Sequence, residues 1–324
     1  MAELRHLGWD VDYLNIGGGF PAPDETTRSA ARSLLSVIPQ GQPIVLDGLA
    51  LGVLPDVAAE LAPRHPLVAL VHHPLAQETG LTAERADALR RSERAALAQV
   101  REVVVTSPAT AKLVASDYGV PVNHITVARP GNDPVPLSAR EPNDLPHLLS
   151  VGAVVPRKGF DILVHALAAL ADIPWRLTIV GDLTRNPNEA AKLEHLVSQY
   201  GLTGRIETVG AVSRSLLETL FGKADLFVLA SRFEGYGMAY AEALSHGLPV
   251  IGTNAGAIPD TIPTGAGLLV PPDDPAALAT ALRSVILDAD RRRVLSEAAL
   301  VAARTLPTWQ QSAAIFAVTL DRLA

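Results

Sequence analysis

Residues 233–244 read FEGYGMAYAEAL, and this stretch joins a predicted strand to a predicted helix. The strand is the apolar run Leu226–Leu229, and the helix is expected to begin at Met238. Gly235 and Gly237 permit unusual backbone angles and a close approach of the main chain to a ligand. In an open α/β sheet, ligands bind where strands end and helices begin, and a helix N-terminus favours an anion. The stretch therefore predicts a doubly wound sheet with an anion site at this turn.

Two carboxylates flank this turn. Glu234 precedes the helix, and Glu242 lies about one turn into it. Carboxylates accept hydrogen bonds from sugar and ribose hydroxyls, whereas helix N–H groups hold phosphate. Either Glu alone could equally be a solvated helical residue or an N-terminal charge. The whole string favours a ligand in which a sugar is joined to a diphosphate.

Short apolar runs alternate with longer periodic segments along the chain, which predicts parallel sheets covered on both faces by helices. In the first half, the predicted strands and helices are Val11–Ile16, Pro43–Asp47, Leu67–Val71, Val103–Thr106 and Ile125–Ala128, and Asp24–Ile38, Leu54–Ala62, Thr82–Gln99 and Pro108–Tyr118. In the second half, they are Leu148–Gly152, Leu177–Gly181, Ile206–Val209, Leu226–Leu229, Pro249–Gly252 and Gly267–Val270, and Phe160–Ala171, Asn188–Tyr200, Arg214–Gly222, Met238–His246, Pro275–Asp288 and Thr308–Leu323.

A length of 324 residues predicts two domains. We expect Rossmann-like domains over 1–140 and 141–306, joined by a linker rich in Pro, Asn and Asp, with the helix of 307–324 packing back on the first domain. The chain opens on a predicted helix, Ala2–Leu7, where a doubly wound sheet normally has a strand. Either the first domain lacks that strand or the chain is truncated at its start, and we expect truncation.

Composition narrows the classes of partner. Hydrophobic residues make up 48% of the chain and aromatic residues only 4%, so aliphatic side chains must fill both cores. The formal net charge of −7 argues against a nucleic-acid-binding face. The absence of cysteine excludes disulfides and thiolate metal sites. Without a predicted membrane span or signal pattern, a cytoplasmic protein is expected, and peripheral membrane contact stays open.

The spacing Glu234-x7-Glu242 in this setting resembles the signature of retaining glycosyltransferases of family 4, which have the GT-B fold. Further pieces resemble the family in the expected order, each weak alone: Gly152 with PRKGF at 156–160, LTIVGD at 177–182, GLPVIGT at 247–253, GAIPD at 256–260 and GLLV at 267–270. The resemblance implies two Rossmann-like doubly wound domains facing a central cleft, an N-terminal acceptor domain and a C-terminal donor domain. It also implies a nucleotide-sugar donor and no metal or other cofactor.

The resemblance assigns roles in the second domain. Glu234 would contact the donor sugar near the reacting carbon, and Glu242 would hold the ribose. Lys158 would neutralise the departing diphosphate, because fixed cations stabilise accumulating negative charge. Further donor-binding positions are Arg157, Gly181, Tyr236, Gly237 and Met238.

One position departs from the family pattern. The family usually has Arg directly after the glycine of the first strand of this domain, and here that residue is Ala153. Arg157 could supply the missing charge, or helix N-termini could carry it.

In the first domain, His72 and His73 follow the predicted strand Leu67–Val71. The family often has a histidine after such a strand, close to the donor sugar, so we expect His72 to be catalytic. His73 and Glu78 are expected on the sugar or acceptor side. Each of these residues could equally be a loop cap or a solvated polar group.

The leading hypothesis is a retaining glycosyltransferase of the hexosyltransferase type (EC 2.4) that acts on an unknown acceptor. The alternative is a catalytically weak or inactive nucleotide-sugar-binding module that acts as a scaffold or partner, which Ala153 favours. A two-domain oxidoreductase is disfavoured because the sequence has no dinucleotide-binding fingerprint. Asp273 and Asp274 precede Pro275 and are predicted to cap a helix rather than to bind a metal.

Overall fold

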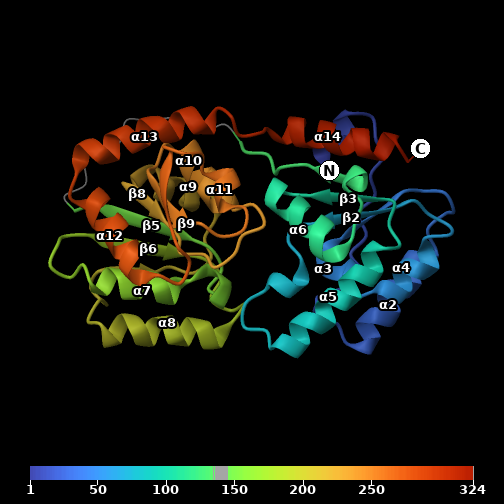
Figure 1. Ribbon diagram of the computed structural model, residues 1–324, viewed down its shortest axis with the longest axis horizontal. Coiled ribbons are helices and arrows are strands. Elements are labelled where there is room, and N and C mark those ends of the chain that lie inside the picture. The colour runs from blue at the N-terminus through green and yellow to red at the C-terminus, as the bar shows by residue number, and fades with distance from the viewer. Residues whose placement is uncertain (134, 136–144, 324) are drawn as a thin grey trace. The chain divides into compact units, whose positions relative to one another are not determined.

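The computed structural model describes residues 1–133, 135 and 145–323 (Figure 1). The chain divides into two compact units, Met1–Gly131 with Pro307–Ala324, and Asn132–Leu306. We call them unit 1 and unit 2. Most of the predicted linker, together with the predicted boundary between residues 140 and 141, lies outside the described residues.

Unit 1 is built on a parallel sheet with the strand order β1-β2-β3-β4. Its strands are β1 (Ile44–Asp47), β2 (Leu67–Val71), β3 (Glu102–Val105) and β4 (Ile125–Val127). Its helices are α1 (Ala2–His6), α2 (Glu25–Ser36), α3 (Gly48–Leu51), α4 (Pro55–Leu61), α5 (Ala83–Leu97), α6 (Pro108–Tyr118) and α14 (Trp309–Asp321), with 3-10 turns η1 (Leu75–Gln77) and η2 (Val122–His124).

The two faces of the unit 1 sheet are covered by different parts of the chain. The strand order never reverses, so right-handed crossovers place the connecting helices on one face. The other face is covered by α14, whose Leu320 and Phe316 pack with Val68 and Val104 (Figure 1). Arg322, just after α14, donates a 3.0 Å hydrogen bond to the Glu102 carboxylate. The C-terminal segment therefore packs on the sheet of the first unit.

Unit 2 is built on a parallel sheet with the strand order β10-β9-β8-β5-β6-β7. Its strands are β5 (His147–Val151), β6 (Arg176–Val180), β7 (Ile206–Thr208), β8 (Leu226–Val228), β9 (Val250–Thr253) and β10 (Gly267–Val270). Its helices are α7 (Phe160–Ala168), α8 (Pro187–Gln199), α9 (Arg214–Lys223), α10 (Met238–Ser245), α11 (Ile258–Thr261), α12 (Pro275–Ile286) and α13 (Ala289–Ala303), with the 3-10 turn η3 (Pro156–Lys158).

The unit 2 sheet reverses its order between β5 and β8. The chain runs outward through β6 and β7, then returns to the other side of β5 and runs outward through β9 and β10. Right-handed crossovers in opposite directions place their helices on opposite faces. Accordingly, α7 and α8 lie on one side of the strands, and α10 with α13 on the other (Figure 1). The chain thus has two Rossmann-like α/β units with parallel sheets, as the sequence predicts.

Some predicted elements agree with the structure, and others do not. The Asp24 cap of α2 is confirmed, because its Oδ1 accepts a 2.7 Å hydrogen bond from the Thr27 N–H. The predicted strand Val11–Ile16 is wrong, because the segment is irregular and Tyr13 is 70% exposed. Its alternating pattern could form a strand only beside a partner strand, and β1 pairs with β2 alone in the described sheet. Helix α13, begun by the cap Asp288, was not predicted.

Gly181 lies where the loops after β5 and β6 touch. A Cβ added at Gly181 would lie 1.8 Å from the Gly152 carbonyl oxygen and 2.4 Å from its carbon. Backbone atoms cannot move aside as a flexible side chain can. The glycine is therefore required by packing, whether or not it also contacts a ligand.

We predict that Gly181→Ala lowers the free energy of unfolding by about 1–3 kcal/mol or more, because the methyl group overpacks two fixed loops. Gly204→Ala is the matched control, since a Cβ there meets no atom within 4 Å. Chemical denaturation of both variants provides the test. Equal stability of Gly181→Ala and wild type would contradict the close contact.

Candidate active site

The candidate site lies at the reversal of the unit 2 sheet. Strands β5 and β8 are hydrogen-bonded neighbours and run parallel, so their carboxyl ends meet at one edge. Lys158 follows β5, and Glu234 follows β8. Open α/β sheets bind ligands at the carboxyl edge where the strand order reverses. The topology therefore brings together residues that lie 76 positions apart.

The turn η3 is pressed against the loop that follows β8. Gly159 ends this turn with φ 65°, and a Cβ there would lie 2.0 Å from the Ala230 carbonyl oxygen. Both the left-handed conformation and the contact require glycine. From the other side, the Ala257 N–H donates a 2.9 Å hydrogen bond to the Glu234 carbonyl. The backbone on either side of the site is thus fixed by packed loops.

The Glu234 carboxylate is the centre of the site. Its residue is only 6% exposed. Lys158 Nζ donates to Oε1 at 2.6 Å, Ser231 Oγ donates to Oε1 at 2.7 Å, and Arg157 Nη1 donates to Oε2 at 3.1 Å. Burial alone would raise the pKa of Glu234, but Lys158 and Arg157 outweigh it and the pKa is lowered. The carboxylate is therefore ionised and clamped.

The trio of Arg157, Lys158 and Glu234 carries excess positive charge. Two cations and one carboxylate give the trio a net charge of +1. Lys158 Nζ carries three N–H donors, and Glu234 takes one of them. The side chains of Arg157 and Lys158 are only 15% and 14% exposed, so water screens them little. The trio is suited to receive an anion.

The N-terminus of α10 adds a second anion-binding feature. Its N-cap is Gly237, with φ 92°, and no side chain accepts a hydrogen bond there. A serine or aspartate cap would neutralise this helix end, whereas glycine leaves its N–H groups for a ligand. Tyr236 is buried, and Met238 is 37% exposed.

Glu242 lies one turn further into α10 and is half-buried. Burial raises its pKa, Arg214 opposes this shift, and the nearby carboxylates of Asp133 and Glu218 add to it. A carboxyl group in this setting can accept hydrogen bonds from a diol.

Comparisons with known proteins place the chain in a family. Residues 137–301, just over half of the chain, match the family model for glycosyl transferases group 1. The chain belongs to this family. Its members are sugar-transferring enzymes (EC 2.4), and their fold is GT-B.

Relatives of this group 1 glycosyltransferase span several reactions. The MMP α-(1→4)-mannosyltransferase of Mycolicibacterium hassiacum is 27% identical over 327 residues, which cover 94% of this chain and 77% of that enzyme. A D-inositol 3-phosphate glycosyltransferase of Xylanimonas cellulosilytica is 33% identical over 214 residues, covering 61% of this chain and 51% of the relative. The chain thus spans about half the length of the latter.

A solved structure shows the same fold. Sucrose-phosphate synthase from Thermosynechococcus elongatus is 25% identical, with a TM-score of 0.77 over 91% of this chain and 77% of that one. Together with the family match, this likeness establishes two Rossmann-like units of the GT-B type.

The predicted site residues of unit 1 lie in two histidine–carboxylate pairs. His72 follows β2, and its Nε2 lies 3.0 Å from Asp47 Oδ2, where β1 ends. Burial would raise the pKa of Asp47, but its contacts with His72 and the Leu49 N–H lower it. The ionised Asp47 can fix the ring orientation of His72. His73 Nε2 lies 3.6 Å from Glu78 Oε2.

Sequence reasoning missed the partners of the predicted site residues. Ser231 and Arg232 stand in the loop after β8, and their position at a strand's carboxyl end was an available signal. Asp274 caps α12 as predicted, whereas Asp273 contacts Arg232 instead. The predicted sugar contact of Glu234 stays a prediction, because its oxygens are engaged by Lys158, Arg157 and Ser231.

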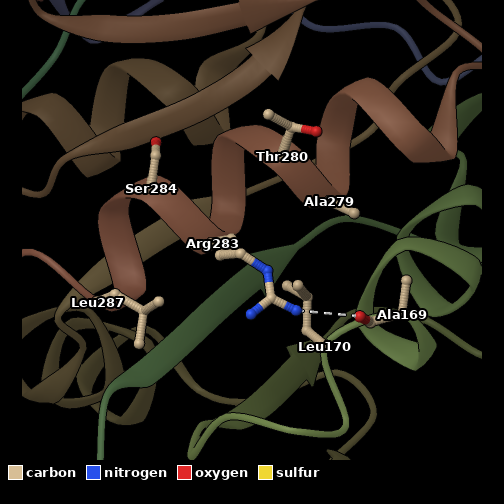
Figure 2. A pocket seen from close by; sticks show the side chains of 7 residues that line it. All are labelled: Ala169, Leu170, Ala279, Thr280, Arg283, Ser284 and Leu287. Carbon is tan, nitrogen blue, oxygen red and sulfur yellow. Dashed lines mark hydrogen bonds between the residues drawn. The ribbon is translucent and has the colours of Figure 1, made fainter.

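One cavity of about 410 Å³ lies away from this site. Its lining residues, shown in Figure 2, come from the loop just after α7, from α12 and from the residue that follows α12: Ala169, Leu170, Ala279, Thr280, Arg283, Ser284 and Leu287. Both helices follow strands and run back, so these ends lie toward the amino edge of the sheet. We assign no catalytic part to it.

Over residues 1–133, 135 and 145–323, no three or more His, Cys, Asp or Glu side chains gather closely enough to hold a metal ion. In the same ranges, no helix has the length and apolar character needed to cross a bilayer.

Glu93 holds the loop that carries His72 and His73. It projects from α5, is 1% exposed, and its Oε2 accepts a 2.9 Å hydrogen bond from the Leu75 N–H. Burial raises the pKa of Glu93 from 4.5 to about 7, although the Leu75 N–H partly opposes this shift. The loop after β2 is therefore held by a hydrogen bond to a carboxyl group that titrates near neutral pH.

We predict that Glu93→Gln flattens the dependence of stability on pH between about pH 4.5 and about pH 7. The folded protein holds the proton more tightly than the unfolded chain. Wild-type stability therefore falls as pH rises from about 4.5 to about 7, by up to about 3 kcal/mol. Denaturant titrations at several pH values measure this slope. Glu84→Gln, on the same helix, is the control, because the pKa of Glu84 is lowered and lies below this window. A slope unchanged in Glu93→Gln would contradict the assignment.

Proposed function

We propose that this protein is a retaining family 4 glycosyltransferase that moves a sugar from a nucleoside-diphosphate sugar to an acceptor. The observation that carries the proposal is the net positive trio of Arg157, Lys158 and Glu234 beside the uncapped α10 N-terminus, at the reversal of the sheet. A diphosphate fits this arrangement because it presents negative charge to cations and to helix N–H groups alike.

The proposed reaction depends on charge that grows as the donor breaks. The bond between the sugar and the diphosphate lengthens, and negative charge collects on the departing phosphate oxygens. Lys158 stabilises this charge with its remaining N–H donors, and the α10 dipole adds to it. These fixed charges supply what a bound metal ion would, so we propose that the enzyme works without one. Displacement on the same face of the sugar retains its configuration, with no residue assigned as covalent nucleophile.

Other residues are assigned by position. Glu242 accepts hydrogen bonds from the ribose hydroxyls, and the backbone at Tyr236, Gly237 and Met238 contacts sugar and phosphate. Arg157 supplies the second cation, which Ala153 cannot. Its Nη1 also donates 2.9 Å to the Phe233 carbonyl, so it is already oriented at the trio. In unit 1, the Asp47-oriented His72 is assigned to the donor sugar, and His73 and Glu78 to the sugar or acceptor.

A second candidate is a donor-binding module with little turnover. Ala153 favours it, because this chain has no arginine at that position, and the Glu234 contacts occupy part of the two remaining cations. Turnover of a donor separates the two candidates.

We predict that one nucleotide class among UDP-, GDP- and ADP-sugars raises the melting temperature, since a ligand that binds only the folded state stabilises it. The enzyme should then slowly hydrolyse the selected donor. Stabilisation without any turnover would support the binding module, and absence of both would contradict the proposed function.

We predict that Glu242→Ala weakens binding of the selected nucleoside diphosphate by about 10- to 100-fold, the loss expected for hydrogen bonds to a charged group. Glu218→Ala is the control, because Glu218 is a neighbouring carboxylate that is half exposed and pairs with Arg214. Calorimetric titration measures both. Equal affinity of Glu242→Ala and wild type would remove the ribose assignment.

A further inference from the structure

Arg232 ties together three loops at the carboxyl edge of the unit 2 sheet. It stands in the loop after β8, and its side chain is 21% exposed. Its partners come from the loop after β5, from the first turn of α7 and from the loop after β10. The loops after β5 and β8 carry the cation trio.

The guanidinium uses most of its donors. Nη1 and Nη2 each lie 3.0 Å from one oxygen of Asp161, a bidentate pair with planar geometry. Nη1 also donates a hydrogen bond to the Pro156 carbonyl, and Nε donates a 2.6 Å hydrogen bond to Asp273 Oδ1. Burial would raise the pKa of Asp161, but Arg232 and Lys192 outweigh it and the pKa is lowered. Arg232 is thus fixed by an ionised, mostly buried partner.

The same residue holds the backbone of the cation-bearing turn. The Arg232 N–H donates 2.8 Å to the Arg157 carbonyl, and its side chain grips the Pro156 carbonyl. Asp161 lies three residues after Lys158. Turn η3 is therefore held at its main chain by Arg232, while Glu234 holds its side chains.

The third partner of the Arg232 side chain, Asp273, has an unusual backbone conformation. Asp273 has φ 57°, the one positive value at a non-glycine residue in the described chain. Residues persist in this conformation where their surroundings fix them. The contact with Arg232 is such a constraint, and it links the loop before α12 to the site.

We propose that Arg232 is a positioning residue that sets where Arg157 and Lys158 stand by clamping the loops after β5, β8 and β10. The predicted effect of Arg232 on turnover rests on the proposed function, whereas the contacts that form the clamp do not depend on it. Lys158 stabilises charge that develops as the donor breaks, so a small displacement of the turn lowers turnover more than it lowers donor binding.

A matched arginine pair exists in the same unit. Arg283 lies 2.7 and 2.8 Å from the two oxygens of Asp172, and its side chain points into the cavity of Figure 2. This pair also joins a helix to a loop through a bidentate contact, but at the other end of α7. Arg283→Gln therefore removes a bidentate arginine–aspartate contact, a more exposed one than that of Arg232, without touching the site.

The first experiment follows hydrogen exchange of the whole chain without ligand. In Arg232→Gln, amides of residues 157–161 and the non-proline amides of 273–277 should exchange faster than in wild type, whereas Arg283→Gln should leave both segments unchanged. Asp273→Gly removes one arm at a backbone angle that glycine adopts freely, and it should loosen 273–277 even if Arg232→Gln folds poorly. Unchanged protection of 157–161 in a folded Arg232→Gln, or of 273–277 in Asp273→Gly, would overturn the clamp.

The second experiment measures hydrolysis of the selected donor. Arg232→Gln should lower kcat by about 10- to 100-fold with a much smaller change in KM. In a Lys158→Gln background the same substitution should cost less, because one of the two cations that Arg232 positions is gone. Arg232→Lys should recover part of the loss, and Arg283→Gln should match wild type.

The outcomes separate the two claims. Wild type that turns over no donor contradicts the proposed function, and hydrogen exchange alone then decides on the clamp. If Arg232→Gln turns over the donor as fast as wild type does, the positioning role is overturned. A loss that is equally large with and without Lys158 would show a general structural role instead.

Discussion

A buried carboxylate held by two cations is the interaction on which the site depends. Removing Glu234 from water is costly, and only full hydrogen bonding offsets that cost. Lys158, Arg157 and Ser231 provide it, and all four groups must then stay at the same edge of the sheet. The arrangement also concentrates positive charge on a protein whose net charge is −7. An anion is therefore drawn to this point rather than to the general surface.

The strand order sets where the site lies, and glycine residues let its loops approach each other closely. Because the strand order reverses between β5 and β8, the loops after these strands meet at the carboxyl edge where open α/β sheets bind ligands. Gly159 lets one loop press on the other, and Gly237 begins α10 without a side-chain cap. Arg232 then fastens the backbone of the same turn. Charge, helix dipole and backbone rigidity act together on one small region, which is what stabilisation of developing negative charge needs.

The repeating features of the fold were predictable, and single contacts were not. Apolar runs and caps place β2, α6 and α2 almost to the residue, because hydrophobic period and capping are local. The segment Val11–Ile16 fails because strand formation depends on a partner, which no local pattern contains. Glu234 was recognisable from its setting. Its engagement with Arg157 and Lys158 was not, because it depends on how two loops 76 residues apart meet.

The most direct test of the cation trio is a crystal structure of the protein grown with a nucleoside diphosphate. The account predicts the diphosphate at the α10 N-terminus, with a phosphate oxygen within hydrogen-bond distance of Lys158 Nζ and the ribose on Glu242. A diphosphate bound elsewhere, with Lys158 still turned to Glu234 alone, would contradict it.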